Sequence, residues 1–281
     1  RNAGWQMTRM NLNTFARHGV FGQKGMTQMI ANRLRDEKLV RKARVFPYQL
    51  MAAFKMADDQ VPAAVRDALQ DAMEIALRNV PALDGHVYVC PDTSGSMGQP
   101  VTGYRKGAST KIRCVDVASL ITAALLHGNR NAVAVPFDTQ VHDMYLKRRD
   151  SVLSNTGKLA ALGGGGTDCS APLRWLNQRT ATVDLVVLIS DNESWFDPAS
   201  NNGWMARRAT PVMREWVQIK QRNPQAKLVC IDLVPNAHTQ AGNCPDILNV
   251  GGFSDAVFTV LAQFAKGNQH QWLDQINGQP L

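Results

Sequence analysis

The segment HVYVCPDTSGSMGQP, residues 86–100, ends a strand-like run in a cluster of oxygen-bearing side chains. Residues 86–90 are rich in β-branched and aromatic residues, which favour a strand. One carboxylate and three hydroxyl groups follow within the next six positions, and they belong to Asp92, Thr93, Ser94 and Ser96. In an open α/β sheet, ligand-binding groups lie in the loops after the strands. This loop is therefore the first candidate for a functional site.

From Gly85 onward, apolar segments of strand length alternate with helical patterns. The expected strands are residues 86–90, 132–137, 184–189, 227–233 and 246–250. The expected helices are residues 112–127, 156–161, 170–177, 211–222 and 254–265. This alternation predicts an α/β fold, a doubly wound, mostly parallel and Rossmann-like sheet with helices on both faces.

Residues 1–80 have a helical pattern instead. An apolar stripe begins after Pro62, Asp36 is placed to cap a short helix, and Pro47 suits the first turn of another. A further helix has Met26, Met29, Ile30 and Leu34 on one face. These four helices form a thin layer, which is typical of the end of a helical-repeat array. We expect a helical module over residues 1–80, a linker at 79–84, an α/β domain over 85–266 and a tail at 267–281.

Three polar clusters fall where the expected strands end. Asp92, Ser94 and Ser96 follow the first strand, Thr167 follows the glycine run at residues 163–166, and Asp191 follows VVLIS. Carboxylates and hydroxyls from three loops predict an all-oxygen site for one Mg²⁺ or Mn²⁺ ion. Taken singly, each cluster could instead be an ordinary cap or turn. No G-K-[ST] follows the glycines, which argues against a phosphate-binding P-loop.

The sequence DTSGS, with GGTD about seventy residues later and SD after a strand, resembles the von Willebrand factor A domain over residues 85–266. The resemblance implies a metal-ion-dependent adhesion site in which Ser94, Ser96 and Thr167 bind the cation directly. Asp92 and Asp191 would act through waters, and one coordination position would accept an acidic group from a partner. Asn192 and Glu193 depart from the family pattern, in which glycine often follows the aspartate.

The net charge of +8 is concentrated near the N-terminus. Residues 1–56 contain 11 Lys and Arg residues and 2 Asp and Glu residues, whereas the rest of the chain contains 20 and 21. This excess predicts contact with a phosphate backbone, with a solvated helical face as the alternative. The candidate RNA-binding residues are Arg17, Arg33, Arg35, Lys38, Arg41, Lys42 and Arg44. Phe46 and Tyr48 could stack on bases, but aromatic residues at helical spacing are more often part of a core.

Residues 36–55, DEKLVRKARVFPYQLMAAFK, resemble the end of the TROVE module of the Ro ribonucleoprotein autoantigens. The resemblance implies a HEAT-like helical ring closed by the A domain, of which this chain holds the last helices. It also implies binding of small noncoding Y RNAs and of single-stranded 3′ ends of misfolded RNAs. An acidic protein ligand or an exoribonuclease could occupy the metal site. Phe46 is a departure, because Ro proteins often place histidine before the proline.

Other features of the sequence limit the location and the kind of function that we expect for the protein. No run of eighteen apolar residues predicts a membrane span, and no signal peptide is visible, so we expect a cytoplasmic protein. The five cysteines are expected to be free thiols. No nucleophile and base pair is apparent, and a hydroxyl-rich metal site favours ligand capture over hydrolysis. We therefore expect a non-enzymatic RNA-binding protein, with a metal-dependent interaction or adhesion domain as the alternative and a nuclease as a third possibility.

Overall fold

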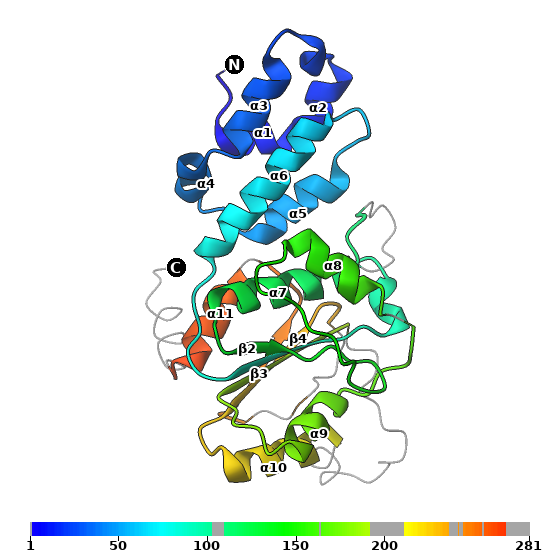
Figure 1. Cartoon of the computed structure of the whole chain (residues 1–281), viewed down its shortest axis with the longest axis vertical. Coiled ribbons are helices and arrows are strands. Elements are labelled where there is room, and N and C mark those ends of the chain that lie inside the picture. The colour runs from blue at the N-terminus through cyan, green and yellow to red at the C-terminus, as the bar shows by residue number, and fades with distance from the viewer. Residues whose placement is uncertain are drawn as a thin grey trace, which may run out of the picture.

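The computed structural model describes residues 2–102, 110–162, 164–191, 211–235, 241, 244–254 and 256–267. Within these residues, a bundle of helices precedes an α/β domain, and the two parts lie end to end (Figure 1). Asn192, Glu193 and almost all of the expected tail, residues 268–281, lie outside the described residues.

A five-stranded parallel sheet forms the centre of the α/β domain, with strand order β2-β1-β3-β4-β5. The strands are β1 (Val87–Pro91), β2 (Ala132–Ala134), β3 (Leu185–Ser190), β4 (Lys227–Asp232) and β5 (Ile247–Gly251). All four pairs are parallel, which confirms the predicted fold class. From β1 the chain passes to β2 on one side, and β3 then begins the other side. The sheet therefore has its topological switch point between β1 and β3.

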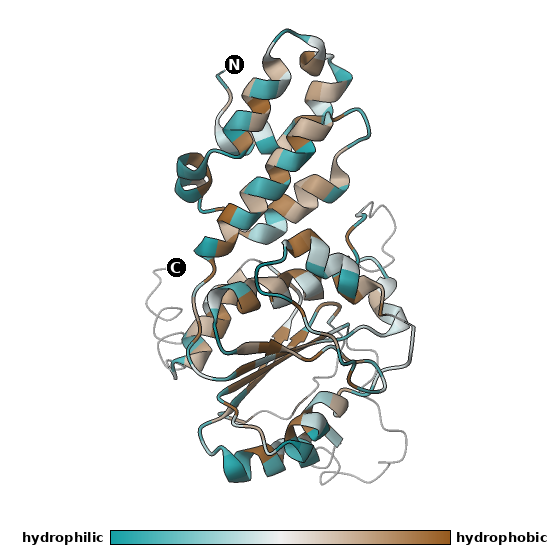
Figure 2. Cartoon of the chain, in the orientation of Figure 1, coloured by the Kyte–Doolittle hydropathy of each residue, from teal (hydrophilic) through white to brown (hydrophobic). Residues whose placement is uncertain are grey.

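Helices cover both faces of the sheet, as the alternating sequence pattern predicts. One face carries α7 (Cys114–Gly128), α8 (Val152–Ala160) and α11 (Ala256–Ala265), and the other carries α9 (Ala171–Gln178) and α10 (Pro211–Arg222) (Figure 1). The strands are hydrophobic along most of their length, whereas α10 shows a polar outer side (Figure 2). β3 is buried at every position, as expected for a central strand with helices on both faces.

Two elements differ from their expected bounds by three or more residues at one end. β2 ends at Ala134 rather than at 137, because Pro136 has no N–H with which to continue a regular ladder. Val135 and Phe137 still donate backbone hydrogen bonds to β1, at 2.8 and 3.1 Å. α8 begins four residues earlier than expected, since Ser151 caps it by accepting a hydrogen bond from the Ser154 N–H at 3.1 Å.

Six helices form the N-terminal part, two more than the sequence pattern defined. They are α1 (Trp5–Met10), α2 (Leu12–Arg17), α3 (Met26–Leu34), α4 (Glu37–Ala43), α5 (Pro47–Met56) and α6 (Ala63–Ala76). The predicted cap is confirmed, since Asp36 accepts a hydrogen bond from the Leu39 N–H at 3.0 Å. Pro47 begins α5 as expected. The apolar stripe of α6 is buried, which confirms its predicted orientation.

The helical part and the α/β domain share one continuous hydrophobic core. Phe46 stacks on Phe258 of α11 with ring centroids 6.0 Å apart, and Tyr48 meets Phe253 edge-on at 4.8 Å. These two aromatic residues therefore belong to the junction, and the core alternative for them is confirmed. The contact explains how a thin layer of helices buries its apolar side.

The structure also bears on the state of the cysteines and on the presence of helices long enough to span a membrane. All five cysteines are free thiols, as predicted, although Cys244 is exposed while the other four are buried. Among the described residues, no helix has the length and apolar character needed to cross a membrane.

Candidate functional site

Asp92 is a fully buried carboxylate at the carboxyl end of β1. It accepts hydrogen bonds from the backbone N–H of Ser94 at 2.8 Å and from the hydroxyl of Ser190 at 2.7 Å. Burial raises the pKa of Asp92 to about 6; these hydrogen bonds partly oppose the rise, and the nearby charge of Asp191 adds to it. A buried carboxylate near a second one is poised for a cation, which would offset both the desolvation and the repulsion.

The two predicted serine ligands lie side by side in the turn after Asp92. The Oγ atoms of Ser94 and Ser96 are 3.2 Å apart, within hydrogen-bonding distance. Ser96 belongs to a short 3₁₀ helix, Gly95–Gly98, which the chain enters through extended backbone at Ser94. This turn places two hydroxyl oxygens at one point of the carboxyl edge of the sheet.

The glycine loop reaches the same turn through the backbone. The N–H of Gly95 donates to the carbonyl oxygen of Gly165 at 3.0 Å. Thr167 is two residues further along, is half-buried, and so lies in the loop that contacts the serine turn. The approach at Gly165 is close, because a Cβ atom there would lie 2.7 Å from Asp138 Oδ2 and one of the two would have to shift.

Asp191 closes the cluster from the end of β3. Its side chain is 1% exposed and accepts a hydrogen bond from the Gln99 amide at 3.0 Å. Its neighbour Ser190 bonds to Asp92, so the two carboxylates flank the switch point between β1 and β3. This is the position at which open α/β sheets bind their ligands.

The residues present fit a hard divalent cation. Among the described residues, no three His, Cys, Asp or Glu side chains form a metal-binding group, so hydroxyl oxygens must supply part of any coordination shell. The structure brings Ser94, Ser96 and Asp92 together directly and Asp191 through Ser190. Thr167 reaches the site by its loop, and its direct role as a ligand stays a prediction.

Sequence reasoning missed two side chains that hold this cluster in place, and a third carboxylate beside the glycine loop. Ser190 orients Asp92, and Gln99 orients Asp191. Asp138 is buried, pairs with His142 at 3.0 Å and accepts the Gln140 N–H at 3.1 Å. Asp138 could have been found, because it follows the expected strand at 132–137 just as Asp92 follows its own strand.

The predicted RNA-binding residues divide into two groups. Arg17, Lys38, Arg41, Lys42 and Arg44 are exposed. Arg33 and Arg35 are half-buried and bond to other residues of the helical part. Arg33 donates to the Ala3 carbonyl at 2.6 Å, and Arg35 donates to the Ala64 carbonyl at 3.2 Å and lies 3.4 Å from Asp71.

Charge pairing separates the exposed cations further. Arg41 pairs with Glu37 at 2.7 Å, and the same carboxylate pairs with Arg78. Lys38, Lys42 and Arg44 have no carboxylate partner within the part of the chain that the structure describes. Arg44 ends α4 in the left-handed conformation, with φ of 47°.

A parallel sheet with hydroxyls and buried carboxylates at its switch point defines the class of von Willebrand factor A domains. The particular family follows from the sequence. Residues 86–265 match the family described as the Ro60 vWA domain, and the chain belongs to that family.

Similar proteins extend the likeness to the helices. The chain is 27% identical over 271 residues to the "RNA-binding protein RO60" of Deinococcus radiodurans, covering 92% of this chain and 48% of that protein. It is 22% identical over 176 residues to the protein of the same name from Caenorhabditis elegans, covering 59% and 26%. The chain thus spans about half or less of the length of these relatives.

A solved structure agrees on the fold. The crystal structure of the Deinococcus radiodurans RO (RSR) protein superposes with a TM-score of 0.75 at 24% identity. The match covers 94% of this chain and 53% of that one, so it includes both the helical part and the A domain.

Proposed function

We propose that this chain binds RNA through the exposed cations of its N-terminal helices. The observation that carries the proposal is the group Lys38, Lys42 and Arg44 on and beside α4, exposed and without carboxylate partners among the described residues. Each phosphate neutralised by such a cation releases counterions and adds affinity. Both relatives are named as RNA-binding proteins, which supports the same function for this chain.

The RNA class follows from the Ro resemblance. We propose small noncoding, Y-like RNA and the single-stranded 3′ ends of misfolded RNA as ligands. Contacts to phosphate position a protein on RNA without reading its bases, which suits recognition of misfolded molecules of many sequences. Met7 and Met10 of α1 are 59% and 70% exposed, and further helices of a ring would find an apolar surface there.

A second part of the proposal concerns the cation. Asp92, Ser94, Ser96, Thr167 and Asp191 would hold one Mg²⁺ or Mn²⁺ ion. When bound, the ion would present a Lewis-acidic position to a carboxylate from a partner, either an acidic protein ligand or an exoribonuclease. Gln99 and Ser190 keep the two carboxylates in place, and the glycine loop closes over the serine turn.

We propose no catalytic role and a cytoplasmic setting. The alternative function, a metal-dependent interaction domain without an RNA role, is favoured by one observation. The site at the switch point is built from buried, mutually supported groups, whereas the basic surface is an exposed helical face.

The test compares salt dependence of RNA binding. Lys38→Gln/Lys42→Gln should weaken all RNAs similarly and reduce the slope of log K against log salt by roughly 0.7–0.9 per lost contact. A matched control, Lys111→Gln/Lys266→Gln, removes the same charge elsewhere on the surface. Equal RNA affinity of both double variants would reject the α4 surface, and no RNA binding at low salt would favour the interaction-domain alternative.

A further inference from the structure

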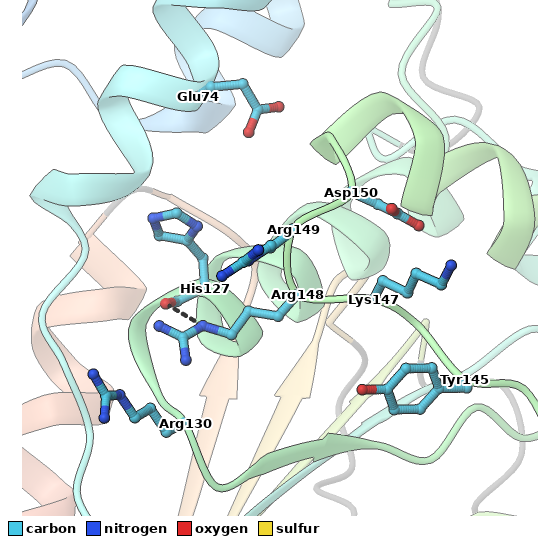
Figure 3. Close-up of a pocket in the computed structure, with 8 residues that line it drawn as sticks. All are labelled: Glu74, His127, Arg130, Tyr145, Lys147, Arg148, Arg149 and Asp150. Atoms are coloured by element: carbon cyan, nitrogen blue, oxygen red, sulfur yellow. Dashed lines mark hydrogen bonds between the residues drawn. The ribbon is translucent and has the colours of Figure 1, made fainter.

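An open pocket of about 810 Å³ lies where α6 meets the A domain. Its wall includes the end of α7 at His127, the approach to β2 at Arg130, and the loop before α8 (Figure 3). Since α7 ends and β2 begins at the amino edge of the sheet, the pocket lies opposite the Asp92 site. Its volume is within the range of pockets that hold small ligands.

The pocket is strongly basic. Four cations line it, Arg130, Lys147, Arg148 and Arg149, and all are exposed. In Figure 3 the side chain of Arg148 lies next to His127 and donates a hydrogen bond to its carbonyl oxygen. Burial lowers the pKa of His127, and the positive charges of Arg148 and Arg78 lower it further.

The two carboxylates of the pocket are already engaged. Glu74 of α6 accepts the backbone N–H of Val152 at 2.9 Å, at the first turn of α8. Asp150 forms an ion pair with Lys158. Among the described side chains, no carboxylate lies within ion-pair distance of Arg130, Lys147 or Arg149. Four cations therefore share the lining with two carboxylates, and an anionic ligand would offset the remaining excess of positive charge.

An aromatic side chain completes the lining. Tyr145 is 83% exposed and lies on the other side of the pocket from His127 (Figure 3). Exposed aromatic rings beside Arg and Lys are the two components of single-strand binding sites, in which bases stack and phosphates pair. An acidic segment of a partner protein could pair with the cations but would have no base to stack on Tyr145, so the lining favours RNA over an acidic protein.

We propose that this pocket binds a segment of single-stranded RNA, with its phosphates on Arg148, Arg149 and neighbouring cations and a base on Tyr145. The proposal rests on the proposed RNA-binding function and adds to it a second contact, on the A domain. RNA held here would touch α6 and the A domain together, and would lie away from the cation site.

The test uses the full chain and a fluorescent ten-nucleotide oligouridylate. Arg148→Gln/Arg149→Gln should weaken binding about tenfold at low salt, with the salt slope shallower by about 0.7 per lost contact. Tyr145→Ala should weaken single-strand binding about fivefold or more and leave duplex RNA unaffected. Arg148 also donates a hydrogen bond to the His127 carbonyl at 3.1 Å, so the double variant loses a structural bond as well as charge. Arg149→Gln alone removes one pocket cation and leaves that bond intact.

The control is Lys111→Gln/Lys266→Gln, which should bind the oligomer like the unaltered chain. Comparison with Lys38→Gln/Lys42→Gln separates the two RNA proposals. If only the α4 variant loses affinity, the pocket proposal is overturned and the proposed function stands. If only the pocket variants lose affinity, the pocket stands and the α4 surface falls.

Two further results would overturn the pocket proposal. Equal losses for single-stranded and duplex RNA, with no effect of Tyr145→Ala, would identify a general polyanion surface. Displacement of the oligomer by micromolar uridine monophosphate would assign the pocket to a free nucleotide rather than to a strand.

Discussion

The ammonium group of Lys55 on α5 lies 3.3 Å from the buried carboxylate of Asp116 on α7. Asp116 is fully buried and also accepts the backbone N–H of Arg113 at 2.9 Å and its guanidinium at 3.0 Å. The pair joins the helical module to the first turn of the helix that leads away from the cation site. One carboxylate therefore caps α7 and anchors α5.

Asp116→Asn should lower the free energy of unfolding by about 2 kcal/mol, because the buried carboxylate loses its charge-assisted hydrogen bonds from Arg113 and Lys55. Lys55→Met should cost less, about 1 kcal/mol, because Arg113 still satisfies the carboxylate and Lys55 is partly exposed. Urea unfolding followed by circular dichroism measures both. Lys24→Met, an exposed lysine of the same module, is the control, and a cost for Asp116→Asn no larger than for this control would contradict the role of the pair.

The acid stability of the protein should depend on the same carboxylate. Burial alone would raise the pKa of Asp116, but hydrogen bonds from Arg113 and the charge of Lys55 hold it below the ordinary value of 3.8. A carboxylate with a lowered pKa stabilises the fold above its unfolded-state pKa, and that stability is lost as the pH falls through the folded value. Asp116→Asn should therefore show a smaller decline in stability below pH 4 than the unaltered chain. Parallel decline of the two proteins would count against this assignment.

The affinity for Mg²⁺ or Mn²⁺ should fall in mild acid. Asp92 has its pKa raised to about 6 by burial, so it is mostly protonated at pH 5 and mostly ionised at pH 7.5. Because the cation requires the carboxylate, affinity should be about tenfold weaker at pH 5. Ser190→Ala removes a hydrogen bond to the carboxylate and should move the midpoint to higher pH. Calorimetric titration with Mn²⁺ measures both shifts, and a flat profile between pH 5 and 7.5 would argue that Asp92 takes no part.

Much of this architecture could be predicted because the apolar pattern is simple. β3 and β4 are apolar along most of their length, and most of the expected helices have one apolar face, so most bounds agree within a few residues. The ligand loops followed from chain order, since parallel strands bring their carboxyl ends to one edge.

Other features depend on contacts that the sequence does not display. The separation of α1 from α2 at Asn11 occurs in short helices without a clear apolar stripe. The basic pocket could not be predicted from the net charge of residues 57–281, because acidic residues elsewhere in that range balance the cations at residues 147–149. The roles of Phe46, Gln99 and Ser190 appear only when distant segments meet.

Gly165→Ala should disrupt the loop that carries Thr167. The added Cβ would lie 2.7 Å from Asp138 Oδ2, too close for any carbon, so the loop or the carboxylate must move. We expect a loss of stability of about 1–3 kcal/mol and weaker cation binding. Gly166→Ala is the matched control, because its nearest atom is Thr139 Cγ2 at 3.5 Å. Equal cation affinity in the two variants would show that the glycine loop does not shape the site.

Finally, the two parts should differ when separated. A fragment of residues 85–266 should unfold cooperatively, because its sheet is covered by helices on both faces. A fragment of residues 1–80 should not, because its core continues into the A domain through Phe46 on Phe258 and Lys55 on Asp116. Thermal unfolding of each fragment by circular dichroism gives the answer. A sharp transition in the 1–80 fragment would show that the helices form a self-sufficient unit and that the shared core is not needed for their folding.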